Sequence, residues 1–544
     1  MGKSVLLIVS LFAVCQSLTA QPHPSDQPRK GIDVLHYDFS LDFPDTGTRI
    51  KALAVVTGRR LEPVKRLTLD LVSLKVDSVT LNNAPAKFVR DSATIQIELP
   101  SFKSSSDTFR AEIYYQGEPA DGLLIGTDKQ GRWSAFGDNW PNRGRMWLAS
   151  VDQPSDKATV TWTVTAPANL RVVANGELVE QTSLSQNATR TRTVWRESRP
   201  IPVYLMVVGA APFVEYDLGE SAVGLSEFHG GVHQSVFAYP EVRDFLPGPF
   251  AKAGDIVEFF ARTVGNFPYE KLAHVQSATK YGGMENASAI FYSNAGFERR
   301  SMGVGVIAHE TAHQWFGDAV TESAWAHVWL SEGFATYFER LWVQHALGDS
   351  VFRDGMAELR NQVLHAKETH DRPVVDTTQG NLLALLNTNS YQKGAWVLHM
   401  LRSLVGDAAF FAGIRSYYEH HRHGNALTED LQAEMEHASG KDLGWFFEQW
   451  LRRPGYAELT IDWEYQKESH SILLKVRQSN RFAPYRFPLT LDVCTSSNQN
   501  ERCTAEIPPS RNGEIKVSLK TISNPSKIVF DPNIQLLGII RENH

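Results

Sequence analysis

The sequence predicts a multidomain α+β protein, in which an N-terminal β domain is followed by a mostly helical domain and then by a C-terminal β-sandwich. Three observations support this fold class. Apolar and polar residues alternate in short segments from Val34 to about Val214, with the period of two that strands show. From about Gly254 to Leu451 the apolar residues recur three and four positions apart, as they do on helices. After Gly455 the alternation returns, and 544 residues are enough for three such domains.

The first twenty residues are predicted to be a signal peptide. Lys3 supplies a positive charge, Val5–Val14 is an apolar stretch, and Leu18–Ala20 ends the segment with a small residue. A membrane-spanning helix requires roughly 20 apolar residues, so this stretch is too short to act as an anchor. We therefore expect cleavage after Ala20, export to the periplasm or the extracellular space, and no stable insertion into a membrane.

The predicted domain boundaries follow the changes of period. We place the N-terminal β domain at residues 21–215, the helical domain at 216–455 and the β-sandwich at 456–544. Strand-like segments of the first domain include Leu67–Leu71, Thr94–Glu98 and Thr159–Val164. Helix-like segments are 255–264, 303–316, 330–345 and 395–404, and the last domain has strand-like segments at 459–463, 472–476 and 487–493.

The composition excludes several classes of protein. Hydrophobic residues make up 42% of the chain, which is typical of a folded protein and argues against extended disorder. Lysine and arginine number 54 against 61 aspartate and glutamate, so the net charge is −7. An acidic balance disfavours binding to a phosphate backbone, and we expect no nucleic-acid partner. The sequence predicts no particular oligomeric state.

Two cysteines, Cys494 and Cys503, remain once the leader is removed. The polar segment Thr495–Arg502 separates two strand-like runs, as in a hairpin, and an exported protein meets conditions that permit disulfides. We expect a disulfide across this hairpin. Two unpaired thiols are the alternative.

The segment His309-Glu-Thr-Ala-His313 has the H-E-x-x-H pattern and lies in a region of helical period. Residues four apart lie on one face of a helix, about 6 Å apart along its axis, so both imidazoles can bind one zinc ion at 2.0 to 2.1 Å. The pattern alone also arises by chance on helices that bind no metal. Further ligands are therefore needed to support a metal site.

Glu332 lies nineteen positions after His313, on the next helix-like segment, and is the predicted third ligand. Two histidines and one carboxylate leave the fourth tetrahedral position open, as catalytic zinc sites do. Zinc lowers the pKa of a coordinated water toward 7, and Glu310 can accept the proton as hydroxide attacks a carbonyl. The sequence thus predicts one Zn²⁺ per chain. An exposed carboxylate on a helix is the alternative for Glu332.

These residues resemble those of the M1 zinc metallopeptidases, the aminopeptidase N and leukotriene A hydrolase family. The similar segments are His309–Gly317 with Glu332 downstream, Gly282–Asn286, Asn266–Lys271, Tyr391–Gly394 and Trp450–Gly455. The resemblance covers roughly residues 30 to 460. It implies a saddle-shaped β domain and a thermolysin-like catalytic domain, with the β-sandwich more loosely similar to the family's third domain. Many relatives carry a C-terminal helical domain that roofs the cleft, and we expect none in this chain.

The resemblance also implies roles for individual residues. Glu285 would bind the free α-amine of the substrate, which makes the protein an exopeptidase. Tyr391 would donate its hydroxyl to the oxyanion of the tetrahedral intermediate. Gly282 and Gly283 would let the chain approach the substrate backbone closely. The implied substrate-binding segment is Gly282, Gly283, Met284, Glu285 and Asn286.

The sequence departs from the family at one position near the amine site. The family commonly has a glutamate or glutamine five positions before an arginine that itself precedes an aspartate by seven. Here Arg145 and Asp152 match that frame, but the position holds Trp140. Asp138 or Asn139 could reach the amine instead, or Trp140 could shape the pocket for the first residue.

The sequence therefore predicts an exported zinc aminopeptidase that removes the N-terminal residue from peptides, with Glu310 as general base. An endopeptidase or an epoxide hydrolase on the same zinc site is an alternative. A catalytically silent protein that binds peptide termini is another. Blocking the amine of the substrate would separate an aminopeptidase from an endopeptidase.

Overall fold

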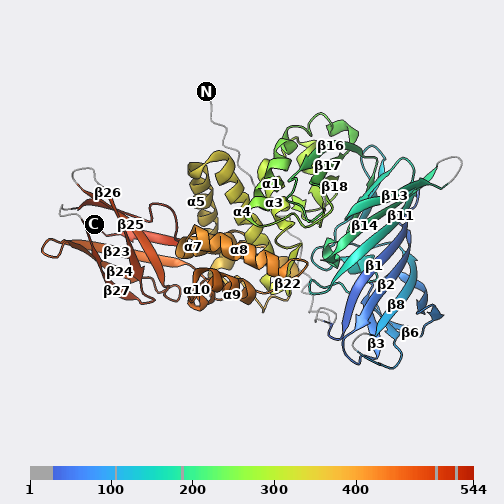
Figure 1. Cartoon of the computed structure of the whole chain (residues 1–544), viewed down its shortest axis with the longest axis horizontal. Coiled ribbons are helices and arrows are strands. Elements are labelled where there is room, and N and C mark those ends of the chain that lie inside the picture. The colour runs from blue at the N-terminus through green and yellow to red at the C-terminus, as the bar shows by residue number, and fades with distance from the viewer. Residues whose placement is uncertain are drawn as a thin grey trace.

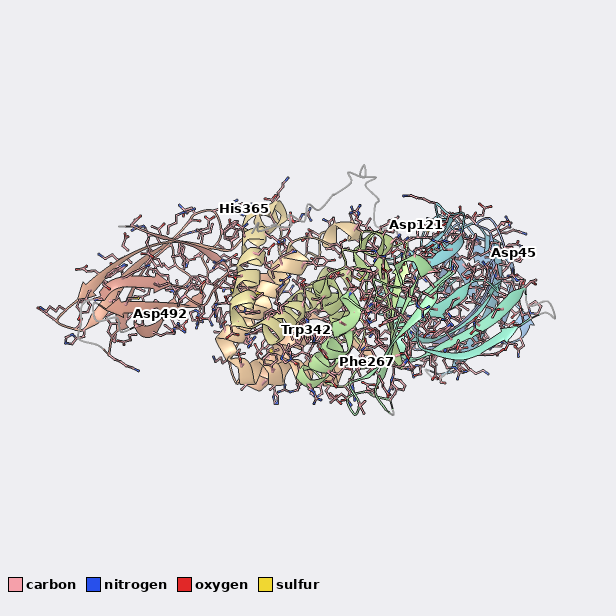
Figure 2. The ribbon with its side chains drawn as sticks, turned by 90° about the horizontal axis from the view of Figure 1, so that it is seen from above. Asp45, Asp121, Phe267, Trp342, His365 and Asp492 are labelled. Atoms are coloured by element: carbon pink, nitrogen blue, oxygen red, sulfur yellow. The ribbon has the colours of Figure 1, made fainter. Side chains whose placement is uncertain are left out.

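The structure is a computed structural model that describes residues 29–104, 107–184, 189–228, 230–495, 500–520 and 525–543. The expected signal peptide, residues 1–20, lies outside the described residues. The N-terminal strands form one end of an elongated molecule, the helices form its centre, and the C-terminal strands form the other end (Figure 1). In the view from above, Asp45 and Asp492 lie toward these opposite ends (Figure 2).

The N-terminal part is built around an eight-stranded sheet of order β13-β14-β11-β1-β2-β8-β4-β5. Its central strand β11, Lys157–Pro167, alternates strictly between buried and half-buried residues, which is the pattern of a strand with one face in the core. Its other strands are β1 (Ile32–Asp42), β2 (Ile50–Arg60), β4 (Lys75–Leu81), β5 (Ala84–Pro85), β8 (Thr108–Gly117), β13 (Glu177–Ser183) and β14 (Arg190–Pro202).

Two smaller sheets complete this part. One has the order β12-β15-β10-β9 and the other β3-β7-β6. The strands are β3 (Arg66–Asp70), β6 (Phe88–Arg90), β7 (Thr94–Glu98), β9 (Leu123–Thr127), β10 (Trp133–Gly137), β12 (Arg171–Ala174) and β15 (Val208–Ala211). The turn after β12 contacts Ala287 and Ser288 of the central part.

A five-stranded sheet of order β16-β17-β18-β20-β19 opens the central part. Its strands are β16 (Val214–Ser221), β17 (Val232–Ala238), β18 (Lys271–Ser277), β19 (Gly283–Met284) and β20 (Ala289–Ser293). Strands β17, β18 and β20 are parallel to one another, and nearly every residue of β18 and β20 is buried. Strands buried on both faces do not alternate, which is why the sequence pattern did not indicate this sheet.

Helices make up most of the rest of the central part, together with a two-stranded parallel sheet of β21 (Val320–Glu322) and β22 (Gly424–Ala426). The helices are α1 (Ala253–Thr263), α2 (Asn294–Glu298), α3 (Val304–His313), α4 (Trp329–Leu347), α5 (Asp349–His365), α6 (Lys367–Asp371), α7 (Gly394–Val405), α8 (Asp407–His421), α9 (Thr428–Ser439) and α10 (Gly444–Leu451). Gly348 and Gly406 end α4 and α7 at φ values of 91° and 87°, a conformation that glycine adopts without strain. None of the helices in the described ranges has the length and hydrophobicity that crossing a bilayer requires.

The last part consists of two sheets, β27-β24-β23-β29 and β26-β25-β28. The strands are β23 (Ala457–Gln466), β24 (Ser471–Gln478), β25 (Phe487–Thr495), β26 (Asn500–Ile507), β27 (Asn512–Ser518), β28 (Pro525–Phe530) and β29 (Gly538–Glu542). Both sheets contribute buried apolar residues to the hydrophobic core, such as Ile461 and Leu474 from one and Leu491 and Val493 from the other.

The predicted disulfide between Cys494 and Cys503 is wrong, because both cysteines are free thiols. They lie on β25 and β26 as expected, but Cys494 stands opposite Asn500 and Cys503 stands opposite Leu491. An offset of three positions puts the two side chains on opposite faces of the sheet. A bridge requires Cβ atoms about 4 Å apart, which this register does not provide.

Candidate metal centre

Three side chains from α3 and α4 converge on one point. His309 and His313 lie one turn apart on α3, and Glu332 lies in the first turn of α4. The two Nε2 atoms are 3.2 Å apart, and Glu332 Oε2 lies 3.5 Å from Nε2 of His309 and 3.4 Å from Nε2 of His313. Ligand atoms on a tetrahedral zinc with bonds of 2.0 to 2.1 Å are about 3.3 Å apart. The three donors therefore fit one zinc ion.

Neighbouring groups orient these donors. His313 Nδ1 lies 3.1 Å from the Phe316 carbonyl and 3.0 Å from Ser331 Oγ. A carbonyl only accepts, so Nδ1 carries the proton and Nε2 is left to bind a metal. Glu339 Oε2 lies 3.8 Å from His309 Nδ1 on the other side of the centre. The sequence analysis did not identify Ser331 or Glu339, although Glu339 lies seven residues after Glu332 on the same helix.

Close contact between two glycines brings Tyr391 to the centre. A Cβ on Gly333 would lie 2.9 Å from the Gly394 Cα, so α4 and the start of α7 touch through their backbones. Tyr391 lies in a π-helical turn, Asn389–Lys393, that runs into α7. Its hydroxyl donates to Glu332 Oε1 at 2.8 Å. Burial raises the pKa of Tyr391 well above its ordinary value, so the hydroxyl stays protonated and remains a donor.

Glu310 is buried beside the histidines, with 6% of its surface exposed. A Cβ on Gly283 would lie 2.2 Å from Glu310 Oε1, so the Glu310 carboxylate occupies the space that a side chain there would need. Burial raises the pKa of Glu310 to about 7, with the two histidines opposing the shift. A carboxylate with such a pKa can accept and release a proton near neutral pH.

Glu285 faces the same group of side chains. Donor atoms of Glu285, Glu310 and His313 all lie within 4.8 Å of one another. Glu285 follows β19, and burial raises its pKa above the ordinary value. Its neighbours Met284 and Asn286 are also buried, and both amide atoms of Asn286 have no hydrogen-bond partner within the described ranges. By contrast, a Cβ on Gly282 would meet no atom within 4 Å.

Asp138 and Asn139 are both engaged inside the N-terminal part. Asn139 donates to the carbonyls of Val203 and Met206 at 3.2 and 2.6 Å, and its own carbonyl accepts from Trp147 Nε1 at 2.8 Å. Asp138 Oδ1 pairs with an Arg143 nitrogen at 2.8 Å. The amide group of Asn139 is thus engaged within the N-terminal part, and Asp138 is paired there with Arg143.

Trp140 follows β10 in the N-terminal part and packs toward the segment that carries Glu285. It packs edge-to-face against Trp325, with ring centroids 5.4 Å apart, and against Tyr281 at 6.4 Å. Tyr281 immediately precedes Gly282, and only 3% of the Trp140 surface is exposed. Trp140 therefore contacts the segment that carries Glu285 through Tyr281.

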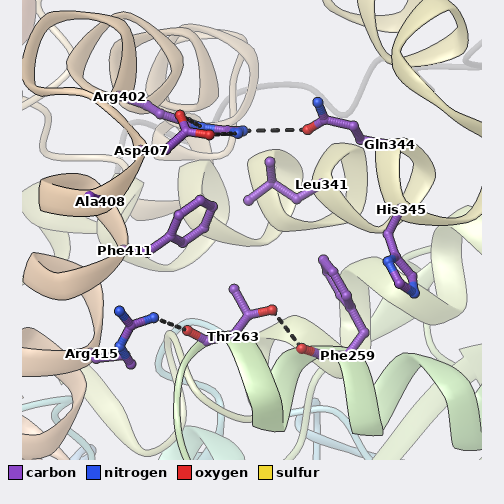
Figure 3. A pocket seen from close by; sticks show the side chains of 10 residues that line it. All are labelled: Phe259, Thr263, Leu341, Gln344, His345, Arg402, Asp407, Ala408, Phe411 and Arg415. Atoms are coloured by element: carbon purple, nitrogen blue, oxygen red, sulfur yellow. Dashed lines mark hydrogen bonds and ion pairs between the residues drawn. The ribbon is translucent and has the colours of Figure 1, made fainter.

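Several cavities lie in the central part of the molecule, and two of them bear on the site. One of about 210 Å³ is lined by Trp325, Leu382 and Leu385 among others, and the Leu385 carbonyl accepts a hydrogen bond from Ser390, the neighbour of Tyr391. The other, of about 520 Å³, lies between α1, α4, α7 and α8, and its lining includes none of the metal donors (Figure 3). The lining of the smaller cavity also includes none of the metal donors, and its link to this region is through Trp325 and the Leu385–Ser390 hydrogen bond.

Comparison with protein families gave two matches. Residues 34–205 match the peptidase M1 N-terminal domain, and residues 250–450 match the peptidase family M1 domain. The two matched ranges cover more than half of the chain, and they coincide with the N-terminal strands and the central helices.

Curated relatives include the glutamyl aminopeptidase of Homo sapiens, which is 27% identical over 427 residues, or 75% of this chain and 43% of the relative. The Tricorn protease-interacting factor F2 of Thermoplasma acidophilum is 27% identical over 419 residues, or 73% of this chain and 50% of the relative. A probable aminopeptidase 2 of Sulfurisphaera tokodaii is 24% identical, over 85% of this chain and 59% of the relative. The chain thus spans about half the length of these relatives.

Solved structures are also similar. An M1 zinc metallopeptidase of Deinococcus radiodurans superposes with a TM-score of 0.69 at 26% identity, covering 78% of this chain and 95% of that chain. A two-domain M1 zinc metallopeptidase bound to L-tryptophan gives 0.70 at 26% identity, covering 79% and 97%. The Legionella pneumophila aminopeptidase A gives 0.82 over 96% of this chain and 61% of that chain, but at 16% identity it shows the fold alone.

Proposed function

Because the chain belongs to peptidase family M1, we propose that it is a zinc-dependent aminopeptidase that hydrolyses the first peptide bond of its substrates. The observation that carries this proposal is the buried group in which three metal donors, one general base and one further carboxylate meet within a few ångströms. Relatives named as aminopeptidases support it.

The donor set suits Zn²⁺, which would be held by His309 Nε2, His313 Nε2 and Glu332 Oε2. When bound there, zinc supplies Lewis-acid activation of the scissile carbonyl and of water. Glu310 takes the proton from the attacking water and passes it to the leaving amine, because its carboxylate is buried beside the metal donors and can both accept and donate a proton there.

Tyr391 stabilises the developing oxyanion. Its hydroxyl points at the metal centre, where it donates to Glu332, and the same hydroxyl can turn to an oxyanion on the substrate. Since the π-helical turn and the Gly333–Gly394 contact fix its backbone, little reorganisation is needed during the reaction.

Glu285 recognises the substrate amine. A buried carboxylate loses hydration, and pairing with an ammonium group compensates that loss. Its position within 4.8 Å of Glu310 and His313 sets the distance between the amine and the first peptide bond. Trp140, Tyr281 and Trp325 form the wall against which the first side chain packs. No observation favours an endopeptidase, an epoxide hydrolase or a silent binding protein.

The proposal is tested by turnover of one peptide in two forms. The zinc-loaded protein should release the first residue from a tripeptide with a free amine, and N-acetylation should reduce that rate by more than about 100-fold, since a charge-assisted contact and its alignment are both lost. Cleavage of the acetylated peptide at a comparable rate would instead identify an endopeptidase.

We further propose that the protein is exported. The support is the charged, apolar and small-residue order of residues 1–20. Mass spectrometry of the protein from its native cell should find an N-terminus at Gln21, and a mature protein that still begins at Met1 would contradict this.

A further inference from the structure

The segment that carries Glu285 is held by contacts from several elements. Residues 285–288 connect β19 to β20, and all four residues are buried. Ser288 adopts a φ of 60°, which is uncommon for a residue with a side chain and persists only where surrounding contacts hold it. The contacts of this segment therefore decide where the Glu285 carboxylate lies.

One contact comes from the metal-binding region. Gln314, the neighbour of His313, donates through Nε2 to the Glu285 carbonyl at 2.8 Å and accepts at Oε1 from the Ser288 N–H at 2.7 Å. A single side chain therefore holds both ends of the segment. This couples the segment to the metal donors.

A second set of contacts comes from the N-terminal part, through the turn after β12. Asn175 Nδ2 donates to the Ala287 carbonyl at 2.7 Å, and the Gly176 N–H donates to Ser288 Oγ at 2.7 Å. Lys271 Nζ donates to the Ser288 carbonyl at 2.7 Å and to the Ala174 carbonyl at 3.0 Å. The lysine thus joins the segment to β12.

The turn is itself fixed. Asn175 also donates to the Leu205 carbonyl at 2.8 Å, and its own carbonyl accepts from the Val207 N–H at 2.7 Å. Gly176 has a φ of 76°, and a Cβ there would lie 1.8 Å from the Arg196 carbonyl oxygen. Only glycine fits at this position, so the turn has one shape.

From these contacts we propose that the Asn175–Gly176 turn and Lys271 position Glu285 for amine recognition. The N-terminal β part then acts as a component of the active site, through Ala287 and Ser288, although none of its residues is assigned to the chemistry. A carboxylate that measures a substrate amine must be held to within about half an ångström, and two anchored carbonyls and a hydroxyl provide that restraint. This inference rests on the proposed role of Glu285.

The test measures amine selectivity without turnover. Calorimetry on the zinc-loaded protein gives dissociation constants for leucine hydroxamate and for its N-acetyl derivative, which share the zinc-binding group and differ in the amine. The dissociation constant of the N-acetyl derivative divided by that of leucine hydroxamate reports amine recognition. Ser288→Ala should lower this ratio about threefold and Lys271→Met about tenfold, as expected for a neutral and a charged hydrogen bond. The affinity for the N-acetyl derivative should not change.

Lys157→Met is the matched control. Lys157 is another buried lysine, on β11 rather than β18, and its Nζ donates to the carbonyls of Asp318 and Ala319 at 2.9 Å each. It touches no residue of the 285–288 segment through these bonds, so the ratio should stay at the wild-type value.

Three outcomes would overturn the inference. An unchanged ratio in Ser288→Ala and Lys271→Met would exclude positioning, and a parallel loss of both affinities would indicate general structural damage instead. If Lys271→Met does not fold, Ser288→Ala decides alone, because it removes only one hydroxyl. If the wild-type protein itself shows no preference for the free amine, amine recognition by Glu285 fails, and this inference fails with it.

Discussion

The position of the Glu310 carboxylate depends on the missing side chain of Gly283. A Cβ added to Gly283 would lie 2.2 Å from Glu310 Oε1, which is closer than any Cβ contact in a folded protein. The resemblance to the family implied that Gly282 and Gly283 let the chain approach the substrate backbone closely. The structure shows that the space beside Gly283 is taken by the carboxylate of Glu310, the proposed general base. This contact is between residues far apart in the chain, so no local pattern could have predicted it.

We predict that Gly283→Ala lowers kcat by about 100-fold, because Glu310 is pushed from its place and misalignment of about an ångström has effects of this size. The zinc content should not change. Steady-state kinetics and metal analysis on the same preparation measure both. Gly303→Ala is the control, since a Cβ there meets no atom within 4 Å and φ is −95°. Equal activity of the two variants would contradict this account.

The assignment of Glu310 leads to a second prediction. Glu310→Gln keeps the shape of the side chain but removes its ability to accept a proton. We expect kcat to fall by about 10³-fold, within the range for loss of a general base, while one zinc per chain remains. Retained turnover would show that another group accepts the proton.

At the scale of elements, helices α3 and α4 were predictable, and the sheet between them and the N-terminal strands was not. The 3.6-residue period and the His309–His313 spacing placed two ligands on one helix, and α4 begins three residues before Glu332. Strands β18 and β20 are buried on both faces and show no alternation. The disulfide was mispredicted because strand register is not visible in cysteine spacing.

The contact between α4 and the start of α7 gives a prediction about this pair of elements. Gly333→Val should destabilise the fold by about 1–3 kcal/mol, since its side chain overlaps the Gly394 backbone. It should also lower kcat, because Tyr391 moves with α7. Denaturant unfolding and kinetics check both effects. Gly444→Ala is the control, because the closest atom to its Cβ is 3.4 Å away. If Gly333→Val changed neither the free energy of unfolding nor kcat, the close packing of α4 against the start of α7 would be contradicted.

At the scale of the whole molecule, ionic contacts join parts that are distant in sequence. Glu227, which is largely buried, pairs with Arg422 at 2.7 Å, His423 at 2.8 Å and Arg199 on β14 at 3.1 Å. Burial opposes ionisation of Glu227, but His423 and the two arginines outweigh it and hold its pKa below the ordinary value of 4.5. The ionised form is therefore the one that stabilises the assembled molecule.

This gives a pH dependence with a definite sign. Because the pKa of Glu227 is lowered in the folded state, its contribution to the free energy of unfolding is complete above pH 4.5. This contribution is lost as the pH falls toward the lower pKa of the folded state. The difference in Tm between the wild type and Glu227→Gln should therefore be constant from about pH 6 to 8 and should shrink below about pH 4.5. A difference that grows as the solution becomes more acidic would contradict the assignment.

Within the described residues, the succession of N-terminal strands, central helices and C-terminal strands was predictable from period, except for the buried sheet β16-β17-β18-β20-β19. The metal site was predictable from the H-E-x-x-H pattern together with Glu332. The residues that support the site could not be predicted. Lys271 and Asn175 contact the 285–288 segment and Glu339 contacts His309 only because the fold brings these polar residues there. Residues that act through long-range contacts leave no local pattern to detect.

Metal analysis of the purified protein tests the central claim most directly. Plasma mass spectrometry should find one zinc per chain in the wild type and almost none in His313→Ala, since one of three donors is lost. Chelation should abolish release of the first residue, and zinc should restore it. A wild-type protein that binds no zinc, or that keeps full activity after its metal is removed, would contradict the account.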